Sequence, residues 1–536
     1  MEKRKITVLV ILLLMFTAVG ARLYFVSTGN IKLANITGSS KTQILSSLRG
    51  NIYDCNFEKL VNRKEETVIC AMPFYESAKI LKGRVNDELY LKFLKSLQNG
   101  EVFIEKTDTF DFRNDFIDYS KIYSRYDDSF LACHILGYAD ADNIGVCGIE
   151  KSFDELLKED NSTLSLKFMT DAKNKLLKGE SISFISNNYF SKKGVMLTID
   201  RSIQKICENA MKLKNVDCGA CVVLDADNSE IKALSSFPSF DVNNLEKSLN
   251  DEKSPFLNRT LCSYSVGSIF KSVVCASAVK YGFDDYSYNC KGSCNVGEIK
   301  FSCSNGVSHK NEDLSLALKN SCNTYFINLA MKIGKKKIID MARNLGFGES
   351  FSLCEGIFDD GGYLPGVDDI DTDGALANLS FGQGKLMASP LQIAMCYGAL
   401  VSDGKLKFPS LVKSTVSTDG KITPYKNNNP VIRALTQEES AKVKKLLLKN
   451  MEYENYLCAK PDCDNISGGK TSTAQTGWYD EKNREILHCW FAGFVDINDK
   501  TYVIVIFKEN GISGANDCAP VFREIANRLI IYNKES

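Results

Sequence analysis

The pattern of apolar and polar positions divides the chain into three parts. Residues 6–26 are almost entirely apolar, and Arg22 is the one charged residue among them. A stretch of this length can cross a membrane if Arg22 extends its side chain to the interface. Residues 30–190 carry many charges between short apolar runs, whereas residues 195–536 hold longer runs with the period of a strand or a helix. The pattern therefore predicts a membrane anchor followed by two domains.

The second of these domains, residues 195–536, shows both periods. Residues 220–224 and 230–234 are apolar runs on either side of the polar sequence DADNS, which is typical of a β-hairpin. Two further strands and five helices are expected at 488–495 and 501–507, and at 203–212, 314–333, 390–400, 437–450 and 520–532. This order predicts an α/β (α+β) domain in which helices flank an antiparallel sheet.

The charges beside the apolar run predict its orientation. Lys3, Arg4 and Lys5 precede it, and basic residues favour the cytoplasmic side of a membrane. Residues 1–5 are therefore expected to form a cytoplasmic tail, with both domains exported. A cleaved signal peptide is the alternative, because residues 19–21 form a tolerable cleavage site. Both interpretations place the domains outside the cytoplasm.

Composition narrows the function. The chain has 66 basic and 66 acidic side chains, so it lacks the basic excess that a nucleic-acid-binding protein usually carries. It also has 19 cysteines, an odd number, and many of them lie within apolar runs. Free cysteine behaves as a small apolar side chain when it is buried, so most of these thiols are expected to be reduced.

The first candidate for chemistry is Ser268, three residues before Lys271 and followed by the apolar sequence SVVCASAV. Residues three apart lie on one face of a helix. A serine hydroxyl is a poor nucleophile until a base takes its proton, and a buried lysine with a lowered pKa can be that base. Alone, this pair is a weak signal, because many such matches are solvated helix faces.

Two further short sequences strengthen the signal. One is Ser321-Cys322-Asn323, and the other is Lys470-Thr471-Ser472 within SGGKTSTAQTG. A hydroxyl between two lysines can pass protons, an amide can hold a peptide, and a lysine can pair with a carboxylate.

Taken together, the three sequences resemble the S-x-x-K, S-x-N and K-T-G signature of the penicillin-binding protein and serine β-lactamase superfamily. The chain is most similar to class B penicillin-binding proteins, and the similarity extends over nearly its whole length. Additional matching segments are Arg49–Asp54, His134–Gly137, Ser236–Asp241, Phe381–Gly384 and Trp490–Gly493. The resemblance implies a serine β-lactamase-like transpeptidase domain at 195–536, preceded by a pedestal (dimerisation-type) domain at 30–190 and an anchor at 6–26. No glycosyltransferase module is recognisable.

The resemblance also implies a mechanism. Ser268 attacks the penultimate D-alanine carbonyl of a peptidoglycan stem peptide, and Lys271 takes its proton. Ser321 relays a proton to the leaving amine, while Asn323 holds the substrate backbone. β-Lactams mimic the same peptide end and acylate Ser268.

Substrate binding is implied for the third motif. Lys470 and Thr471 bind the terminal carboxylate, and the backbone N–H groups of Ser268 and Thr473 form the oxyanion hole. Ser472 stands where the family usually has glycine, and its side chain is expected to intrude beside Lys470 and narrow the site. Val266 stands where the family usually has proline.

Metal binding is disfavoured by spacing. Cys290, Cys294, Cys303 and His309 are possible zinc ligands, but their spacing fits no compact zinc module, so free thiols or one disulfide are favoured. The mechanism needs no cofactor. The acidic pair at 359–360 is expected to lie in a solvated loop.

Three other functions stay open. A D,D-carboxypeptidase or a β-lactamase would use the same motifs, and a scaffold or β-lactam sensor of a cell-wall complex would not need catalysis. The expected partners are stem peptides, β-lactams, the membrane, and a membrane glycosyltransferase within a cell-wall synthesis complex. The expected location is the bacterial cytoplasmic membrane, with a single crossing and an extracytoplasmic catalytic domain.

Overall fold

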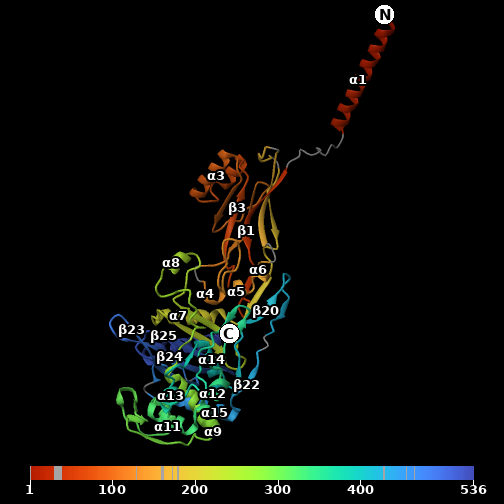
Figure 1. Cartoon of the computed structure of the whole chain (residues 1–536). Coiled ribbons are helices and arrows are strands. Elements are labelled where there is room, and N and C mark those ends of the chain that lie inside the picture. The colour runs from red at the N-terminus through yellow and green to blue at the C-terminus, as the bar shows by residue number, and fades with distance from the viewer. Residues whose placement is uncertain are drawn as a thin grey trace. The chain divides into compact units, whose positions relative to one another are not determined.

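The computed structural model describes residues 2–28, 39–127, 130–158, 162–171, 173–177, 180–426, 429–453, 456–463 and 465–535. Residues 30–38, the start of the expected pedestal domain, lie outside these ranges. The chain forms two compact units (Figure 1). The first comprises Met1–Ser47, Glu65–Tyr123 and Thr163–Tyr189, and the second comprises Leu48–Lys64, Ser124–Ser162 and Phe190–Ser536.

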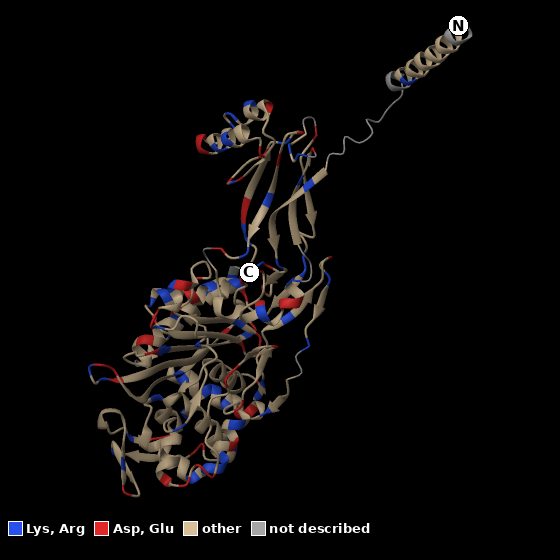
Figure 2. Ribbon diagram, turned by 45° about the horizontal axis from the view of Figure 1, so that its top comes forward, with Lys and Arg blue, Asp and Glu red and all other residues tan. Residues whose placement is uncertain are grey.

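Helix α1 (Glu2–Thr28) carries the apolar run. Its segment Ile6–Tyr24 is long and apolar enough to cross a membrane. The side chains described there are exposed, and the helix is almost free of charge in Figure 2.

Besides α1, the described residues of the first unit form two small sheets and two helices. One sheet has the order β1-β6-β7 and the other has the order β4-β3-β5. Helix α3 begins after Asn86, whose side chain accepts a hydrogen bond from the Leu89 backbone, and ends at Gly100 in the left-handed conformation. Its buried residue Phe93 packs edge-on against Phe103. The elements are β1 (Ser39–Leu48), β3 (Lys64–Ala71), α2 (Tyr75–Leu81), α3 (Asp87–Asn99), β4 (Phe103–Thr107), β5 (Ile117–Ser124), β6 (Ser162–Thr170) and β7 (Ser183–Asn187).

The second unit is built on a five-stranded sheet of order β10-β9-β25-β24-β23, in which every neighbouring pair is antiparallel. The predicted hairpin is present, because β9 pairs with β10. The strands are β9 (Gly219–Asp225), β10 (Ile231–Phe237), β23 (Ser467–Tyr479), β24 (Glu485–Ile497) and β25 (Lys500–Glu509). The prediction of an antiparallel sheet flanked by helices is confirmed.

Helices cover both faces of this sheet because alternate strand residues point to opposite sides. Cys221 and Val223 share a core cluster with α7 (Arg201–Leu213) and α16 (Ala519–Glu535). Val222 and Leu224 belong to the other cluster, with α9 (Lys271–Tyr281) and α14 (Pro390–Val401). Figure 1 shows α7 and α14 separated by the sheet.

Acidic and basic residues are interspersed along the ribbon of this unit in the view of Figure 2. One buried network ties residues from its separate chain segments together. The Glu150 carboxylate, fully buried, accepts hydrogen bonds from Arg49 Nε at 2.9 Å and Arg125 Nε at 2.7 Å. Tyr126 donates a third bond at 3.1 Å. These bonds join residues that precede and follow the β3–β5 region of the first unit, so the second unit needs both segments.

The predicted helix at 314–333 is wrong in one respect. The segment forms two helices, α10 (Leu314–Lys319) and α11 (Asn323–Ile333), separated by Ser321 with φ of +51°. A residue whose backbone is in the left-handed region cannot continue a right-handed helix.

Other elements lie near Ser321 or pack against α9 and β23. They are β12 (Tyr288–Cys290), β13 (Ser293–Val296), β14 (Ile299–Ser302), β15 (Lys310–Glu312), α13 (Asp373–Ser380) and α15 (Gln437–Asn450).

Candidate active site

Ser268 lies in a single turn of 3₁₀ helix, η1 (Gly267–Phe270), that leads directly into α9. Gly267 has φ of +60°, and a Cβ atom there would lie 2.5 Å from Ser472 Oγ. Its N–H donates to the Gly382 carbonyl at 2.8 Å. A glycine is therefore required immediately before Ser268, both by the backbone conformation and by the close packing.

Lys271 begins α9, which is buried on all sides as far as Val279. Its side chain is 0% exposed. Its Nζ lies within hydrogen-bond distance of three acceptors: Ser321 O at 2.7 Å, Ser321 Oγ at 2.9 Å and Asn323 Oδ1 at 2.7 Å. Burial lowers the pKa of Lys271 well below its ordinary value, and the nearby charge of Lys470 lowers it further. The lowered pKa favours the uncharged form of the amine, which can accept a proton.

Lys271 is connected to Ser268 through Ser321. The Ser321 hydroxyl donates to Ser268 Oγ at 3.0 Å, and it is also the group that contacts Lys271 Nζ. Among the hydrogen bonds of the described residues, this is the one route between Lys271 and Ser268. The resemblance implies that Lys271 takes the proton of Ser268, and the structure places the Ser321 hydroxyl between the two groups.

The backbone at Ser321 explains this position. Its φ of +51° is rare for a residue with a side chain, and such a conformation costs about 1–3 kcal/mol. It turns both the carbonyl and the hydroxyl of Ser321 towards Lys271. Asn323, at the start of α11, is fixed at both ends of its amide, because Nδ2 donates to the Ser302 carbonyl at 3.1 Å.

The third motif lies on β23, an edge strand of the sheet. Lys470 and Ser472 are buried on one side, whereas Thr471 is half-buried and Thr473 is exposed. Lys470 Nζ donates to the Thr471 carbonyl at 2.8 Å, and burial lowers the pKa of Lys470 to about 7. No hydrogen bond among the described residues joins Thr471 or Thr473 to Ser268.

The side chain of Ser472 makes a specific contact that its position in the motif did not predict. Its hydroxyl donates to the Val266 carbonyl at 2.9 Å, and its side chain is 3% exposed. The extra side chain is thus held against the turn that presents Ser268. Trp490, paired with Ser472 across the sheet, supports the same turn by donating from Nε1 to the Ser265 carbonyl at 2.9 Å. Neither contact could be inferred from the amino-acid sequence.

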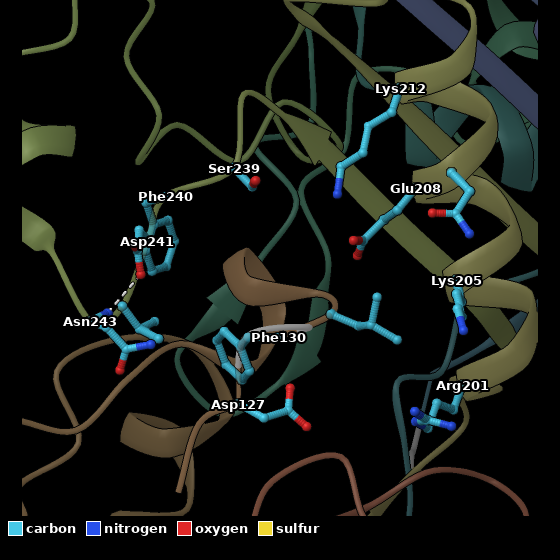
Figure 3. Close-up of a pocket in the computed structure, with 13 residues that line it drawn as sticks. Asp127, Phe130, Arg201, Lys205, Glu208, Lys212, Ser239, Phe240, Asp241 and Asn243 are labelled. Carbon is cyan, nitrogen blue, oxygen red and sulfur yellow. Dashed lines mark hydrogen bonds between the residues drawn. The ribbon is translucent and has the colours of Figure 1, made fainter. Parts of the chain in front are cut away.

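A cavity of about 600 Å³ lies elsewhere in the second unit, between α7 and the segment that follows β10 (Figure 3). Its charged lining consists of three basic and three acidic side chains: Arg201, Lys205, Lys212, Asp127, Glu208 and Asp241. This balance gives no preference for an anionic or a cationic ligand, and Ser268, Lys271 and Lys470 are not in the lining.

The possible metal ligands are arranged differently from the prediction. Cys290, Cys303 and His309 come together, but the fourth described side chain in the group is Cys322 and not Cys294. The 19 cysteines, all within the described residues, form no disulfide.

The expectation of a solvated loop is wrong for Asp359. Its side chain is 0% exposed, and its carboxylate accepts hydrogen bonds from Ser389 Oγ and from the Gly361 N–H.

Known proteins match this architecture. The family described as penicillin binding protein transpeptidase domain matches residues 219–527. Stage V sporulation protein D of Bacillus subtilis is 27% identical over 399 residues, which cover 71% of this chain and 59% of that protein. Peptidoglycan D,D-transpeptidase MrdA of Haemophilus influenzae is 25% identical over 431 residues, covering 72% of this chain and 63% of that protein. The chain thus spans about six tenths of the length of these relatives.

A solved structure shares the fold. It is described as "Structural coordination of polymerization and crosslinking by a peptidoglycan synthase complex". One of its chains superposes with a TM-score of 0.68 at 20% identity and covers 97% of both chains.

Proposed function

Because the chain belongs to the penicillin-binding protein transpeptidase family, as a class B penicillin-binding protein, we propose that it is a serine D,D-transpeptidase that cross-links peptidoglycan. The observation that carries this proposal is the connected group of Lys271, Ser321 and Ser268. A buried amine with a lowered pKa, linked through a hydroxyl to a half-buried serine, is the arrangement that an acyl-transfer enzyme requires.

The first half-reaction forms an ester. With Lys271 uncharged, the hydroxyls of Ser268 and Ser321 rotate so that each donates towards the amine. As Ser268 Oγ attacks the carbonyl of the penultimate D-alanine, its proton passes to Ser321, whose own proton passes to Lys271 Nζ. The same route then returns a proton to the nitrogen of the terminal D-alanine when the C–N bond breaks.

The second half-reaction consumes the ester. An amine from a neighbouring stem peptide attacks the acyl carbon, gives up a proton along the same route, and releases Ser268. Asn323 is fixed by Lys271 and Ser302 and is available to orient the peptide backbone. Lys470 is the proposed partner of the terminal carboxylate, whose negative charge would favour the protonated amine. Thr471, Ser472 and Thr473 complete this binding strand, with the N–H groups of Ser268 and Thr473 as oxyanion donors. β-Lactams would acylate Ser268 by the same first step.

Location and partners follow from the same family. We place the catalytic unit outside the cytoplasmic membrane, held by a single crossing through α1, whose segment Ile6–Tyr24 is long and apolar enough for this role. The resemblance to a chain of a peptidoglycan synthase complex supports a membrane glycosyltransferase partner that makes the glycan strand.

The proposal is tested with a synthetic stem pentapeptide ending in D-Ala-D-Ala and an excess of an acceptor amine. A transpeptidase releases one D-alanine for each new amide bond, detected by mass spectrometry. Release of D-alanine with water as the sole acceptor would indicate a D,D-carboxypeptidase instead. Rapid turnover of penicillin would indicate a β-lactamase. Absence of all three activities, with Ser268→Ala still supporting cell growth, would indicate a scaffold or sensor.

A further inference from the structure

Three cysteines and one histidine converge directly behind the active site. Cys290 ends β12, Cys303 follows β14, His309 precedes β15, and Cys322 caps the start of α11. One ligand atom from each side chain lies within 4.8 Å of all the others. Cys290 and Cys322 are 0% exposed and Cys303 is 4% exposed, while His309 is half-buried.

Three of the six separations between these atoms match those of a tetrahedral metal site. Zn–S and Zn–N bonds of about 2.3 Å and 2.0–2.1 Å, at tetrahedral angles, place two sulfurs about 3.8 Å apart and a sulfur about 3.5 Å from a nitrogen. Cys290 Sγ lies 3.8 Å from Cys303 Sγ and 3.5 Å from His309 Nδ1. Cys303 Sγ lies 3.8 Å from Cys322 Sγ. A disulfide needs a sulfur–sulfur separation of about 2.05 Å, so none of these pairs is a bond.

The surroundings of the sulfurs are polar in the way that thiolate ligands require. Thr324 Oγ1 donates to Cys290 Sγ at 3.2 Å, and the Gly292 N–H donates to the same sulfur at 3.3 Å. Thr324 Oγ1 also lies 3.5 Å from Cys322 Sγ and 3.6 Å from Cys303 Sγ. Buried thiols that only pack against apolar side chains do not require hydrogen-bond donors. In metal sites, hydrogen bonds to the ligand groups orient the ligands around the ion.

The polypeptide around the cluster buries little surface of its own. Between residues 291 and 311 the buried residues are Gly292 and Cys303, and the hairpin of β13 and β14 is largely exposed. A cross-link or a metal ion adds most to the stability of a segment that buries so little apolar surface. The cluster joins this segment to α11, beside the hydrogen bond from Asn323 Nδ2 to the Ser302 carbonyl.

We propose that Cys290, Cys303, Cys322 and His309 bind a structural Zn²⁺ ion. The three thiols each release a proton on binding and the imidazole binds neutral through Nδ1, so the complex carries a net charge of −1. Four protein ligands complete the coordination shell and leave no position for water, which makes the ion structural and not catalytic.

The position of Cys322 gives the ion a consequence for the site. Cys322 is the residue between Ser321 and Asn323, the two groups that contact Lys271. The Ser302 carbonyl, next to Cys303, also accepts the amide of Asn323. The ion would bind Cys322 and Cys303, which lie next to Asn323 and Ser302, and would thereby hold the two residues of this hydrogen bond together. It would also maintain the left-handed backbone at Ser321. This second statement rests on the proposed function, whereas the metal site itself does not.

Metal content tests the site without reference to activity. The full chain is purified in mild detergent with a reductant, without oxygen and without chelators, and its zinc and iron are measured by plasma mass spectrometry. About one zinc per chain is expected. After chelation, one equivalent of Co²⁺ should restore an intense thiolate-to-cobalt absorption in the near ultraviolet together with tetrahedral d–d bands. Iron in place of zinc, no stoichiometric metal, no cobalt spectrum, or a disulfide between two of the cysteines would each overturn the proposal.

Variants then connect the metal to the site. Cys303→Ser should lower zinc content and Co²⁺ absorption, whereas the matched variant Cys294→Ser, on the same hairpin but outside the cluster, should leave both at the wild-type level. Removing zinc from the wild type should slow acylation by a fluorescent penicillin at least tenfold, and adding Zn²⁺ should restore it. Stoichiometric zinc with unchanged acylation after its removal would overturn the coupling and keep the site. Full zinc with no acylation at all would contradict the proposed function and leave the metal site standing.

Discussion

Replacing Lys271 by methionine removes the amine and keeps a side chain of similar length in a position that is 0% exposed. If Lys271 is the general base, acylation of Ser268 should slow by about 10²–10⁴-fold, which is the usual contribution of such a base. Each factor of ten corresponds to about 1.4 kcal/mol of barrier, so the loss amounts to about 3–5 kcal/mol.

We expect a smaller effect of this substitution on the stability of the fold. The Ser321 carbonyl and Asn323 Oδ1 each lose their donor at 2.7 Å, and an unsatisfied buried acceptor costs about 1–3 kcal/mol. Against this, the variant no longer buries an amine, and burial of that group is itself unfavourable. We expect the melting temperature of Lys271→Met to fall by only a few degrees.

The assay is the second-order rate constant for labelling by a fluorescent penicillin, measured beside the thermal transition of each protein. Lys280→Met is the matched control on the same helix, because Lys280 Nζ donates to the Ala434 carbonyl and is remote from the motif residues in the hydrogen-bond network. Its labelling rate should stay within about twofold of the wild type, well below the effect of losing a base. Labelling of folded Lys271→Met within about tenfold of the wild-type rate would refute the assignment of Lys271 as the base.

Three other changes test separate parts of the structure. Glu150→Ala removes the buried carboxylate that Arg49 and Arg125 share and leaves Arg49 paired with Asp154 alone, so the free energy of unfolding should fall by about 3–5 kcal/mol in denaturant titrations; a loss below about 1 kcal/mol would contradict the network. Burial raises the pKa of Asp359 to about 7, so the folded state holds a proton that the unfolded state loses near pH 4, and stability should fall as pH rises from about 4 to about 7. Asp359→Asn should flatten this slope, and an unchanged slope would show that another group causes it. Ser472→Gly removes the bond to the Val266 carbonyl and should alter acylation by several β-lactams unequally, within about tenfold; identical rates for all of them would rule out a role for Ser472 in shaping the site.

The sequence predicted the parts of the fold that depend on local pattern. The hairpin at 220–234 and the helix at 437–450 appear where apolar spacing and turn residues place them, as β9 with β10 and as α15. The helix α15 even begins with the capping box of Thr436 and Glu439. The spacing of Ser268 and Lys271 also predicts one helical segment, and Ser268 lies in η1, which runs directly into α9 at Lys271.

The remaining features depend on which distant segments meet. Periodicity shows which face of an element is apolar, but it does not show that Cys322 lies beside Cys290, or that Asp359 is enclosed by Ser389. The left-handed backbone at Ser321 is equally hidden, because it is imposed by tertiary contacts and not by the preference of serine. The hydrogen bonds from Lys271 to Ser321 and from Ser321 to Ser268 depend on that backbone, and their geometry could not be obtained from the motif spacing.

The most direct test of the central claim is intact-mass analysis and peptide mapping after brief exposure to penicillin, comparing the wild type with Ser268→Ala. The wild type should gain the mass of one opened penicillin, carried by the peptide that contains Ser268, and the variant should gain none. A label on another residue, equal labelling of both proteins, or no label on folded wild type would contradict the assignment of Ser268 as the nucleophile.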